Sequence, residues 1–479
     1  MNIVCPRSTS NAAVCLILFL YVLLPGCATH PKAPDLGELY TRGAQYHGVE
    51  SNPVIVIPGV LGSRLELENS DLVVWGAFSG EYANPSTPSG ARLVALPMEK
   101  GVPLAGLSDN VKSVGSLDRL RLTLLGLPLE LNAYVNILAS LGVGGYRDEE
   151  LGLAGAVDYG EDHFTCFQFH YDWRRSNVEN ARALSRFIRE RKQYVEKEME
   201  ARYGAHGDVK FDIVAHSMGG LLTRYFLRYG EQSLPADGSL PDLNWEGAGL
   251  VDRVILVGTP NAGSCDVITK LRNGLPLGLI ANFPATILGT HPSLYELLPR
   301  SRHGAFVEAE NAEARLDVYD PAVWKRLGWG LADPAGSEVL ADILADEPDP
   351  DARADIAMDH LSKCLANAKQ FQAAMDLPAT PPPGVELYLV AGDAEDTELV
   401  IGGDLESGKL KILQHGPGDG TVARYSALMD ERQGNEWKPF LQSPIGWHHV
   451  TFIFEDHLGM TMDPMFTDNV LYLLLESPK

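Results

Sequence analysis

The sequence predicts an α/β fold: a mostly parallel sheet with flanking helices and an inserted helical cap. From Asn52 to the end of the chain, short apolar runs alternate with helical patterns, which is typical of strands joined by crossover helices. Apolar residues make up 45% of the 479 residues, so the chain can bury a large core, and general disorder is excluded.

Apolar runs and helical periodicity locate the main elements. The runs expected to be strands are residues 54–57, 165–171, 211–215, 251–257, 385–391 and 450–454. The segments with helical periodicity are 181–203, 219–229 and 466–476. Because strands that alternate with helices form βα units, we expect these strands to run parallel.

Two stretches depart from this alternation. Residues 79–115 are rich in Gly, Pro and Ser without a sustained period, so a lid-like insertion is expected at about 66–115. Residues 265–383 are too many for a structureless loop, which indicates an inserted cap with its own helices. The core is therefore expected to span 51–264 and 384–479.

The N-terminus has the pattern of an export signal. Arg7 precedes an apolar stretch at 12–24 that is too short to cross a bilayer comfortably. The stretch ends Leu-Leu-Pro-Gly-Cys, which resembles a bacterial lipobox with Cys27 as the lipidated residue, and 28–50 would then be a polar tether. We therefore expect an exported, membrane-anchored bacterial lipoprotein that faces the periplasm or the cell surface. An ordinary cleaved signal and an uncleaved anchor are the alternatives.

Charge and cysteine usage exclude several classes of protein. The formal net charge is −24, which argues against nucleic-acid binding and against electrostatic attraction to anionic lipid. Once the leader and Cys27 are set aside, Cys166, Cys265 and Cys364 remain, which allows one disulfide at most. Cys166 lies in an apolar run and is expected to be a buried thiol.

No metal or other cofactor is expected. The cysteines lack metal-ligand spacing, and no H-E-x-x-H motif is present. The acidic run at 346–355 lacks the glycine and the closing glutamate of an EF-hand loop, and two prolines interrupt it. We therefore expect a solvated turn there in preference to a calcium site.

The strongest chemical signal is the segment Ala215-His216-Ser217-Met218-Gly219 between an expected strand and an expected helix. A nucleophile elbow needs this arrangement, because the serine sits in a tight turn and small flanking residues avoid clashes. Ala215 replaces the first glycine of the usual G-x-S-x-G pattern. Ser217 is therefore the candidate nucleophile, and its alternative role is a helix N-cap. We do not interpret His216 as the base.

A nucleophilic serine needs a base and a carboxylate that orients the base. Asp419, in the turn Gly-Asp-Gly-Thr-Val, is the candidate acid, since its glycine neighbours free the backbone to present a carboxylate inward. Asp393 and Asp396 are nearer the end of the expected strand 385–391 and are rivals. A plain β-turn would also explain the glycines.

His457 is the candidate base. It follows the carboxyl end of the expected strand 450–454, where catalytic groups of open parallel sheets gather. His448 and His449 precede that strand and so lie at its wrong end. An oxyanion hole needs two backbone N–H groups, for which we expect Met218 and, in the glycine-containing loop 58–65, Val60.

Taken together, these segments resemble the lecithin–cholesterol acyltransferase family, which includes lysosomal phospholipase A2. The resembling blocks are Pro58-Gly59-Val60-Leu61-Gly62, Tyr171-Asp172-Trp173-Arg174, Ala215–Gly219, Gly258-Thr259-Pro260-Asn261-Ala262-Gly263-Ser264 and Gly418-Asp419-Gly420-Thr421-Val422. The resemblance implies an α/β-hydrolase with Ser217, Asp419 and His457 as its triad, and with the amides of Val60 and Met218 as oxyanion donors.

The chain also departs from that family. Residues 63–113 contain no cysteine, whereas the family's early lid loop is usually closed by a disulfide, and the cap is not matched block by block. Lid behaviour and substrate choice therefore do not carry over. For residues 172–174, a buried ion pair under the elbow competes with a functional role.

The function expected is a serine-dependent acyl hydrolase or acyltransferase acting on phospholipid or other lipid esters. The acyl acceptor is water or a lipid alcohol such as a sterol, and the triad does not choose between them. The short apolar stretch 275–280, with Phe283, is expected to line a site for one acyl chain, so hydrolysis should prevail when the alcohol is scarce. The alternative from another class is a lipid-binding lipoprotein without catalysis.

Overall fold

The computed structural model describes residues 34–46, 48–76, 81–117, 119–124, 127–132, 134–277 and 281–477. The expected leader and Cys27 fall outside these ranges. No helix among the described residues combines the length and the apolar character needed to cross a bilayer.

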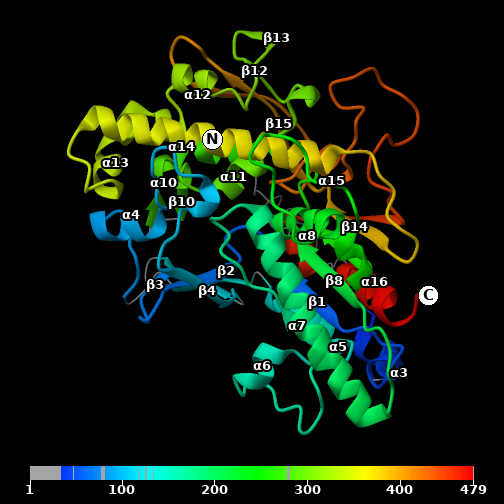
Figure 1. Cartoon of the computed structure of the whole chain (residues 1–479). Helices are drawn as coiled ribbons and strands as arrows, with labels where there is room; N and C mark the ends of the chain where they lie inside the picture. Colours follow the sequence, from blue (N-terminus) through cyan, green and yellow to red (C-terminus); the bar gives the residue numbers. More distant parts are fainter. Residues whose placement is uncertain are drawn as a thin grey trace, which may run out of the picture. The chain divides into compact units, whose positions relative to one another are not determined.

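The centre of the fold is a six-stranded sheet in which every neighbouring pair is parallel (Figure 1). Its spatial order is β7-β1-β8-β9-β14-β17. These strands are β1 (Val54–Ile57), β7 (Cys166–Gln168), β8 (Phe211–His216), β9 (Val251–Val257), β14 (Glu386–Gly392) and β17 (His449–Ile453). The chain order reverses between β1 and β8, and such a point opens a crevice at the carboxyl ends of the strands.

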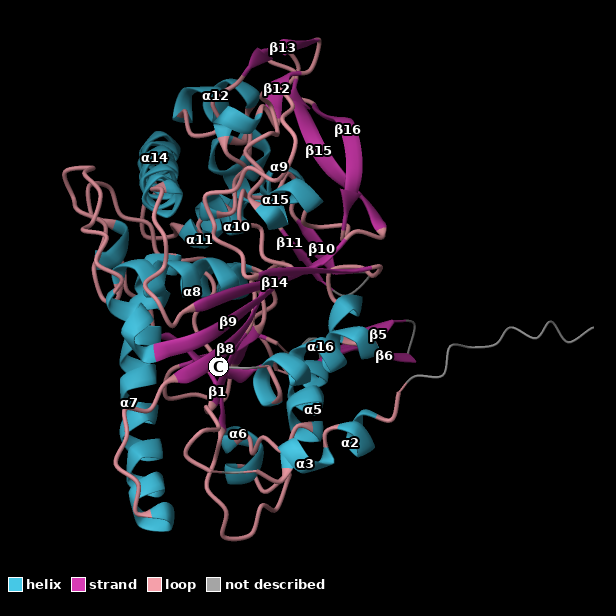
Figure 2. Cartoon of the chain, turned by 90° about the vertical axis from the view of Figure 1, so that its right-hand side faces the viewer, coloured by secondary structure: helices cyan, strands magenta, loops and turns pink. Residues whose placement is uncertain are grey.

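Both faces of the sheet are covered by helices. Ile55, Ile57 and Ile213 pack into one core with α7 (Asn177–Tyr203) and α8 (Met218–Tyr229). The alternate residues Val54, Val56 and Val214 pack into a second core with α5 (Val135–Val143) and α16 (Pro464–Leu475). Figure 2 shows α7 on one side of the strands and α5 and α16 on the other. This layering follows from the period-2 alternation of side chains along each strand.

The predicted strands and helices are confirmed, with small shifts at their ends. β7 is shorter than predicted, because beyond Gln168 the chain leaves the ladder as a buried loop whose Phe169 N–H still bonds the Val56 carbonyl at 2.9 Å. α7 begins earlier than predicted, at Asn177, where the Ser176 side chain accepts a hydrogen bond from the Val178 N–H. A side-chain cap of this kind stabilises the first turn of a helix.

The early insertion contains a three-stranded antiparallel sheet of β2 (Ser63–Leu67), β3 (Val73–Trp75) and β4 (Val111–Ser116), with α4 (Pro88–Val94). The later insertion contains α9 (Asp266–Asn273) and the long α14 (Pro350–Asp376). The remaining helices and strands of these and other connections are α2 (Leu36–Leu39), α3 (Thr41–Ala44), β5 (Arg119–Leu124), β6 (Leu127–Asn132), α6 (Glu149–Leu153), β10 (Leu275–Leu277), β11 (Ala281–Phe283), α10 (Ala285–Leu288), α11 (Pro292–Glu296), α12 (Pro321–Leu327), α13 (Ser337–Ile343) and α15 (Arg424–Leu428).

A second, four-stranded sheet crosses the boundary that we placed at residue 383. Its order is β13-β12-β15-β16, formed by β12 (Phe306–Glu308), β13 (Asn311–Arg315), β15 (Glu395–Gly403) and β16 (Leu410–Gly418). The segment 395–418 therefore packs with the cap strands and not with the central sheet, since β12 pairs with β15 in parallel.

One smaller expectation needs correction, and the expected buried thiol at Cys166 is confirmed. The acidic run is only partly a turn, because Pro350 begins α14 and the Asp349 side chain caps it by accepting from the Asp351 N–H at 3.1 Å. Proline is favoured in the first turn of a helix, where its missing N–H costs nothing. Cys166, Cys265 and Cys364 are each buried and unpaired, so none of them forms the disulfide that the sequence allowed.

Candidate active site

Ser217 lies in a sharp turn between β8 and α8. Its φ and ψ are 53° and −125°, a conformation that side-chain-bearing residues rarely adopt, and its N–H bonds the Val257 carbonyl at 2.7 Å. An N-cap residue has β-region angles and a side-chain bond to the helix, and Ser217 has neither, so the N-cap alternative is wrong. A Cβ on Gly219 would lie 2.5 Å from the Pro58 carbonyl oxygen, so only glycine fits beside β1.

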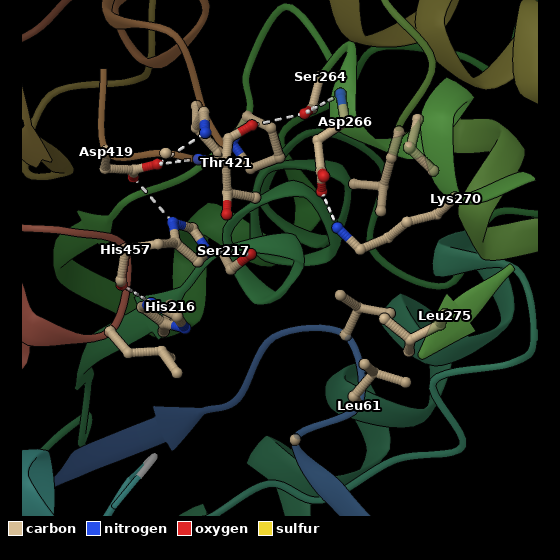
Figure 3. Close-up of a pocket in the computed structure, with 18 of the residues that line it drawn as sticks. Leu61, His216, Ser217, Ser264, Asp266, Lys270, Leu275, Asp419, Thr421 and His457 are labelled. Atoms are coloured by element: carbon tan, nitrogen blue, oxygen red, sulfur yellow. Dashed lines mark hydrogen bonds and ion pairs between the residues drawn. The ribbon is translucent and has the colours of Figure 1, made fainter. Parts of the chain in front are cut away.

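Ser217, His457 and Asp419 form one chain of hydrogen bonds (Figure 3). The distance from Ser217 Oγ to His457 Nε2 is 3.0 Å, and from His457 Nδ1 to Asp419 Oδ2 it is 2.8 Å. Ser217 and Asp419 are buried, and the His457 side chain is 14% exposed. The structure therefore joins the three predicted residues in the order that nucleophilic catalysis requires.

The β15–β16 hairpin positions Asp419. It leaves the sheet at the end of β14 and brings the chain back there, with Glu395 bridged to Asp419. The second carboxylate oxygen, Oδ1, accepts hydrogen bonds from the N–H groups of Thr421 at 3.0 Å and Val422 at 2.6 Å. These bonds fix the plane of the carboxylate toward His457.

The rival acids are oriented elsewhere. Asp393 forms an ion pair with Arg424, and Asp396 is exposed on β15. Neither belongs to the hydrogen-bonded chain, and the residues between the expected strand 385–391 and Asp419 are largely the β15–β16 hairpin.

His457 follows the carboxyl end of β17, and its N–H bonds the Asp419 carbonyl at 2.9 Å. Burial alone would lower the pKa of His457, but the Asp419 carboxylate outweighs burial and raises the pKa above its usual 6.5. His448 and His449 are exposed at the opposite end of the strand, where His448 Nδ1 accepts from the Leu387 N–H.

Sequence reasoning missed a second set of contacts behind the histidine. The Gly59 N–H donates to Tyr134 Oη at 2.7 Å, and Tyr134 Oη lies 3.3 Å from His216 Nδ1. His216 Nε2 lies 3.0 Å from the His457 carbonyl oxygen. Burial, followed by the neighbouring His457, lowers the pKa of His216 to about 3, so His216 is neutral and holds the base loop in place. No motif marks Tyr134, because its role depends on contacts far along the chain.

The predicted oxyanion donors lie next to Ser217 in the chain (Met218) and in the lining of the same cavity (Val60). Met218 is the first residue of α8, so its N–H has no acceptor within the helix, and Val60 lines the cavity at Ser217. Gly59 lies against Ser217, since a Cβ there would be 2.7 Å from the serine Cβ. Their role as donors stays a prediction.

The triad opens into a cavity of about 630 Å³ with mainly apolar walls. The apolar residues include Leu61, Trp75, Leu117, Val267, Leu275, Leu288, Leu294 and Leu297. Figure 3 shows Leu61 and Leu275 on the same side of this cavity. Phe283 is buried and packs against Trp75 at 5.2 Å between ring centroids, so it supports the wall and does not line it. Residues 278–280 of the predicted acyl site lie outside the described residues.

Residues 172–174 form a structural anchor. Asp172 and the fully buried Arg174 make a two-point ion pair at 2.9 and 2.8 Å, and Arg174 also bonds Asp109 at 2.7 Å. Burial alone would raise the pKa of Asp172, but Arg174 outweighs it and lowers the pKa. Trp173 is buried edge-on against the cavity residue Trp75. The pair ties the early insertion to the loop after β7, which supports the ion-pair interpretation.

Comparison with known proteins supports the resemblance. Residues 155–322 match the family model of lecithin:cholesterol acyltransferase, a range that contains Ser217 and ends before Asp419. Over this range the chain is similar to the lecithin:cholesterol acyltransferase family. Lecithin-cholesterol acyltransferase-like 4 of Arabidopsis thaliana is 25% identical over 268 residues, which cover 52% of this chain and 43% of that relative. The match thus spans less than half of the relative's length.

A solved structure agrees on the fold of this chain. The crystal structure of the Tle4-Tli4 complex matches with a TM-score of 0.52 and 17% identity, covering 89% of this chain and 98% of that chain. The match to EstA from Clostridium botulinum covers 91% of this chain and 90% of that chain at 14% identity. Its TM-score of 0.32 is too low to support an argument about the fold. The first likeness and the sheet order confirm the expected α/β-hydrolase fold.

Proposed function

We propose that this protein is a serine-dependent acyl hydrolase of phospholipid or other lipid esters. The observation that carries the proposal is the bonded chain Ser217–His457–Asp419 opening on an apolar cavity of about 630 Å³. Apolar walls suit an acyl chain, and the serine lies at the cavity surface where an ester carbonyl would enter. The similarity of residues 155–322 to the lecithin:cholesterol acyltransferase family supports lipid esters as the substrate class.

In the proposed reaction, Ser217 Oγ attacks the ester carbonyl carbon while its proton moves to His457 Nε2. The amides of Val60 and Met218 stabilise the resulting oxyanion. His457 returns the proton to the leaving alcohol oxygen as the carbon–oxygen bond breaks, which leaves an acyl-enzyme. A water molecule then attacks the acyl carbon, gives its proton through His457 back to Ser217, and releases the fatty acid. Asp419 accepts the hydrogen bond from His457 Nδ1 and so holds the imidazole in the required tautomer.

Transfer of the acyl group to a lipid alcohol such as a sterol is the second candidate, favoured by the similarity of residues 155–322 to the lecithin:cholesterol acyltransferase family. We expect the cavity to hold one acyl chain, so hydrolysis should prevail in dilute phospholipid. Product analysis by mass spectrometry, on phosphatidylcholine vesicles with and without sterol, separates the two. Acylated sterol exceeding free fatty acid at low sterol would make transfer the main reaction.

We further propose that Cys27 carries a lipid anchor that places this enzyme at a bacterial membrane, exported toward the periplasm or the cell surface. The support is the sequence pattern alone, since Cys27 lies outside the described residues. Labelled palmitate should enter the wild-type protein and not Cys27→Ser. Label that still enters the variant would refute the anchor.

The test of the proposed function is reaction with a fluorophosphonate, followed by peptide mass spectrometry. We expect a single adduct on Ser217, lost in Ser217→Ala and strongly slowed in His457→Ala. His448→Ala is the matched control, because His448 is a histidine at the opposite end of the same strand, and it should label at the wild-type rate. An unlabelled Ser217 in folded protein would favour the alternative, a lipid-binding protein without catalysis.

A further inference from the structure

An ion pair interrupts the apolar lining of the cavity. Asp266 and Lys270, one turn apart on α9, both line it, and the Lys270 ammonium donates to Asp266 Oδ2. Their side chains are 24% and 36% exposed, so both are partly withdrawn from water. Figure 3 shows the pair on the other side of Ser217 from Asp419 and His457. A substrate bound at Ser217 therefore lies between the triad and this pair.

The start of α9 is attached to the acid turn. Ser264 Oγ accepts from the Asp266 N–H at 3.2 Å and donates to the Thr421 carbonyl at 2.6 Å, two residues from Asp419. This link holds Asp266 at a set position relative to the triad. Consistent with that placement, Asp266 raises and Lys270 lowers the pKa of His457, after the larger influences of burial and Asp419.

The charges around the pair are mostly negative. Glu395 and Asp456 also line the cavity and are exposed, and no described residue forms an ion pair with either. Among the described lining residues, Lys270 is the one lysine or arginine, and Asp266 already neutralises it. A net negative mouth attracts an ammonium group and repels a group of net negative charge.

We propose that Asp266 and Lys270 recognise the head group of the lipid ester and select a zwitterionic head group over an anionic one. This inference rests on the proposed function. The phosphate of the head group binds Lys270, and its ammonium lies against the acidic side chains. Asp266 restrains Lys270, so that an anionic head group gains too little from the lysine to offset the surrounding carboxylates.

The competing interpretation is that the pair only stabilises α9. Ion pairs of residues four apart stabilise exposed helices weakly, and such a role would affect all substrates alike. Head-group recognition instead changes the ratio of rates between substrates. The two interpretations therefore differ in a measurable quantity.

The experiment compares dihexanoyl phosphatidylglycerol with dihexanoyl phosphatidylcholine, both as monomers below the micellar concentration. Monomers keep the net charge of the whole protein from acting through a lipid surface. The measured quantity is the kcat/KM for phosphatidylglycerol divided by the kcat/KM for phosphatidylcholine. Asp266→Asn frees Lys270 and should raise this ratio about tenfold, equivalent to about 1.4 kcal/mol. Lys270→Met should lower it, and the double variant should fall between the two.

Glu196→Gln on α7 is the matched control. Glu196 pairs with Lys192 four residues away, and no residue of α7 lines the cavity, so the same charge change there should leave the ratio as in wild type. A ratio that stays constant in Asp266→Asn, or moves the opposite way, would overturn the inference. Hydrolysis of nitrophenyl butyrate by wild type without either phospholipid being cleaved would also overturn it. Failure of the proposed function is recognised separately, by the absence of a fluorophosphonate adduct on Ser217.

Discussion

Replacing Asp419 by asparagine tests the orientation of the catalytic base. In the structure Asp419 Oδ1 accepts two backbone N–H groups, from Thr421 and Val422, and Oδ2 accepts from His457 Nδ1. Asparagine has one oxygen, and the two backbone donors require it at the Oδ1 position. Its NH₂ group must therefore face His457 Nδ1 and donate to it.

That contact reverses the tautomer of the His457 imidazole. With Nδ1 accepting a hydrogen bond, the proton of neutral His457 moves to Nε2, which lies 3.0 Å from Ser217 Oγ. A protonated Nε2 cannot accept the serine proton, so kcat should fall by about 10⁴, equivalent to about 5 kcal/mol of transition-state stabilisation. Because the two amides hold the oxygen from the backbone, simple rotation of the new side chain does not rescue the enzyme.

The same substitution should shift the decline of kcat/KM at acid pH toward lower pH. Catalysis requires neutral His457, so wild-type kcat/KM should decline as pH falls through a pKa that Asp419 raises above 6.5. In Asp419→Asn the carboxylate that raises the pKa of His457 is gone, whereas the burial that lowers this pKa remains. The residual activity should therefore persist to lower pH than in wild type.

The assay is hydrolysis of a short-chain nitrophenyl ester from pH 5 to 9, with circular dichroism to check folding. Asp393→Asn is the matched control, since Asp393 offers the same chemical change near the end of β14 but bonds Arg424. Asp419→Asn retaining more than a tenth of wild-type kcat would refute the tautomer argument. A larger loss in Asp393→Asn would place the acid nearer the strand.

Three further substitutions test the site and its supports. His457→Ala should lose as much activity as Ser217→Ala, and the double variant should lose little more, because triad members act as a unit; additive losses would argue for independent roles. Gly220→Ala should lower the free energy of unfolding in urea by about 1–3 kcal/mol, since its Cβ would lie 2.0 Å from Thr259 Oγ1; unchanged stability would mean that α8 shifts freely. Arg174→Met should cost about 3–5 kcal/mol in the same measurement, because the buried Asp172 carboxylate would lose its two-point partner and keep only the 3.5 Å ion pair with Arg175, and a cost under 1 kcal/mol would remove the role of Arg174 as an anchor.

The central sheet could be predicted because its strands are buried on both faces. Such strands are rich in apolar residues, as in β1 and in the last four residues of β9, and both strands begin and end at the predicted residues. The helices that follow are long and periodic, as in α7 and α8. Order along the chain then placed Ser217 and His457 at the carboxyl ends of strands, where they lie in the structure.

The four-stranded sheet of β13, β12, β15 and β16 could not be predicted in the same way. Its pairing of Phe306 with Ile401 joins residues far apart in sequence, and β16 is largely exposed, so no apolar run marks it. The contacts of Tyr134 with His216 share this property. A hydrogen bond between distant residues leaves no periodic pattern in either segment.

The glycines of the motif segments explain why the site could be predicted when the cap could not. The ends of β1, β8 and β9 approach more closely than side chains allow, and a Cβ on Gly59 would lie 2.7 Å from the Ser217 Cβ. Gly258 has a φ of 56°, and a Cβ on this residue would lie 3.1 Å from the His457 ring. This crowding restricts the residues that can occupy the triad region, and so it produces recognisable motifs. The cavity walls and the charges of α9 are under no such backbone constraint. Substrate choice therefore depends on side chains such as Asp266 and Lys270, and measuring it requires changing those charges, because triad variants remove activity toward every ester alike.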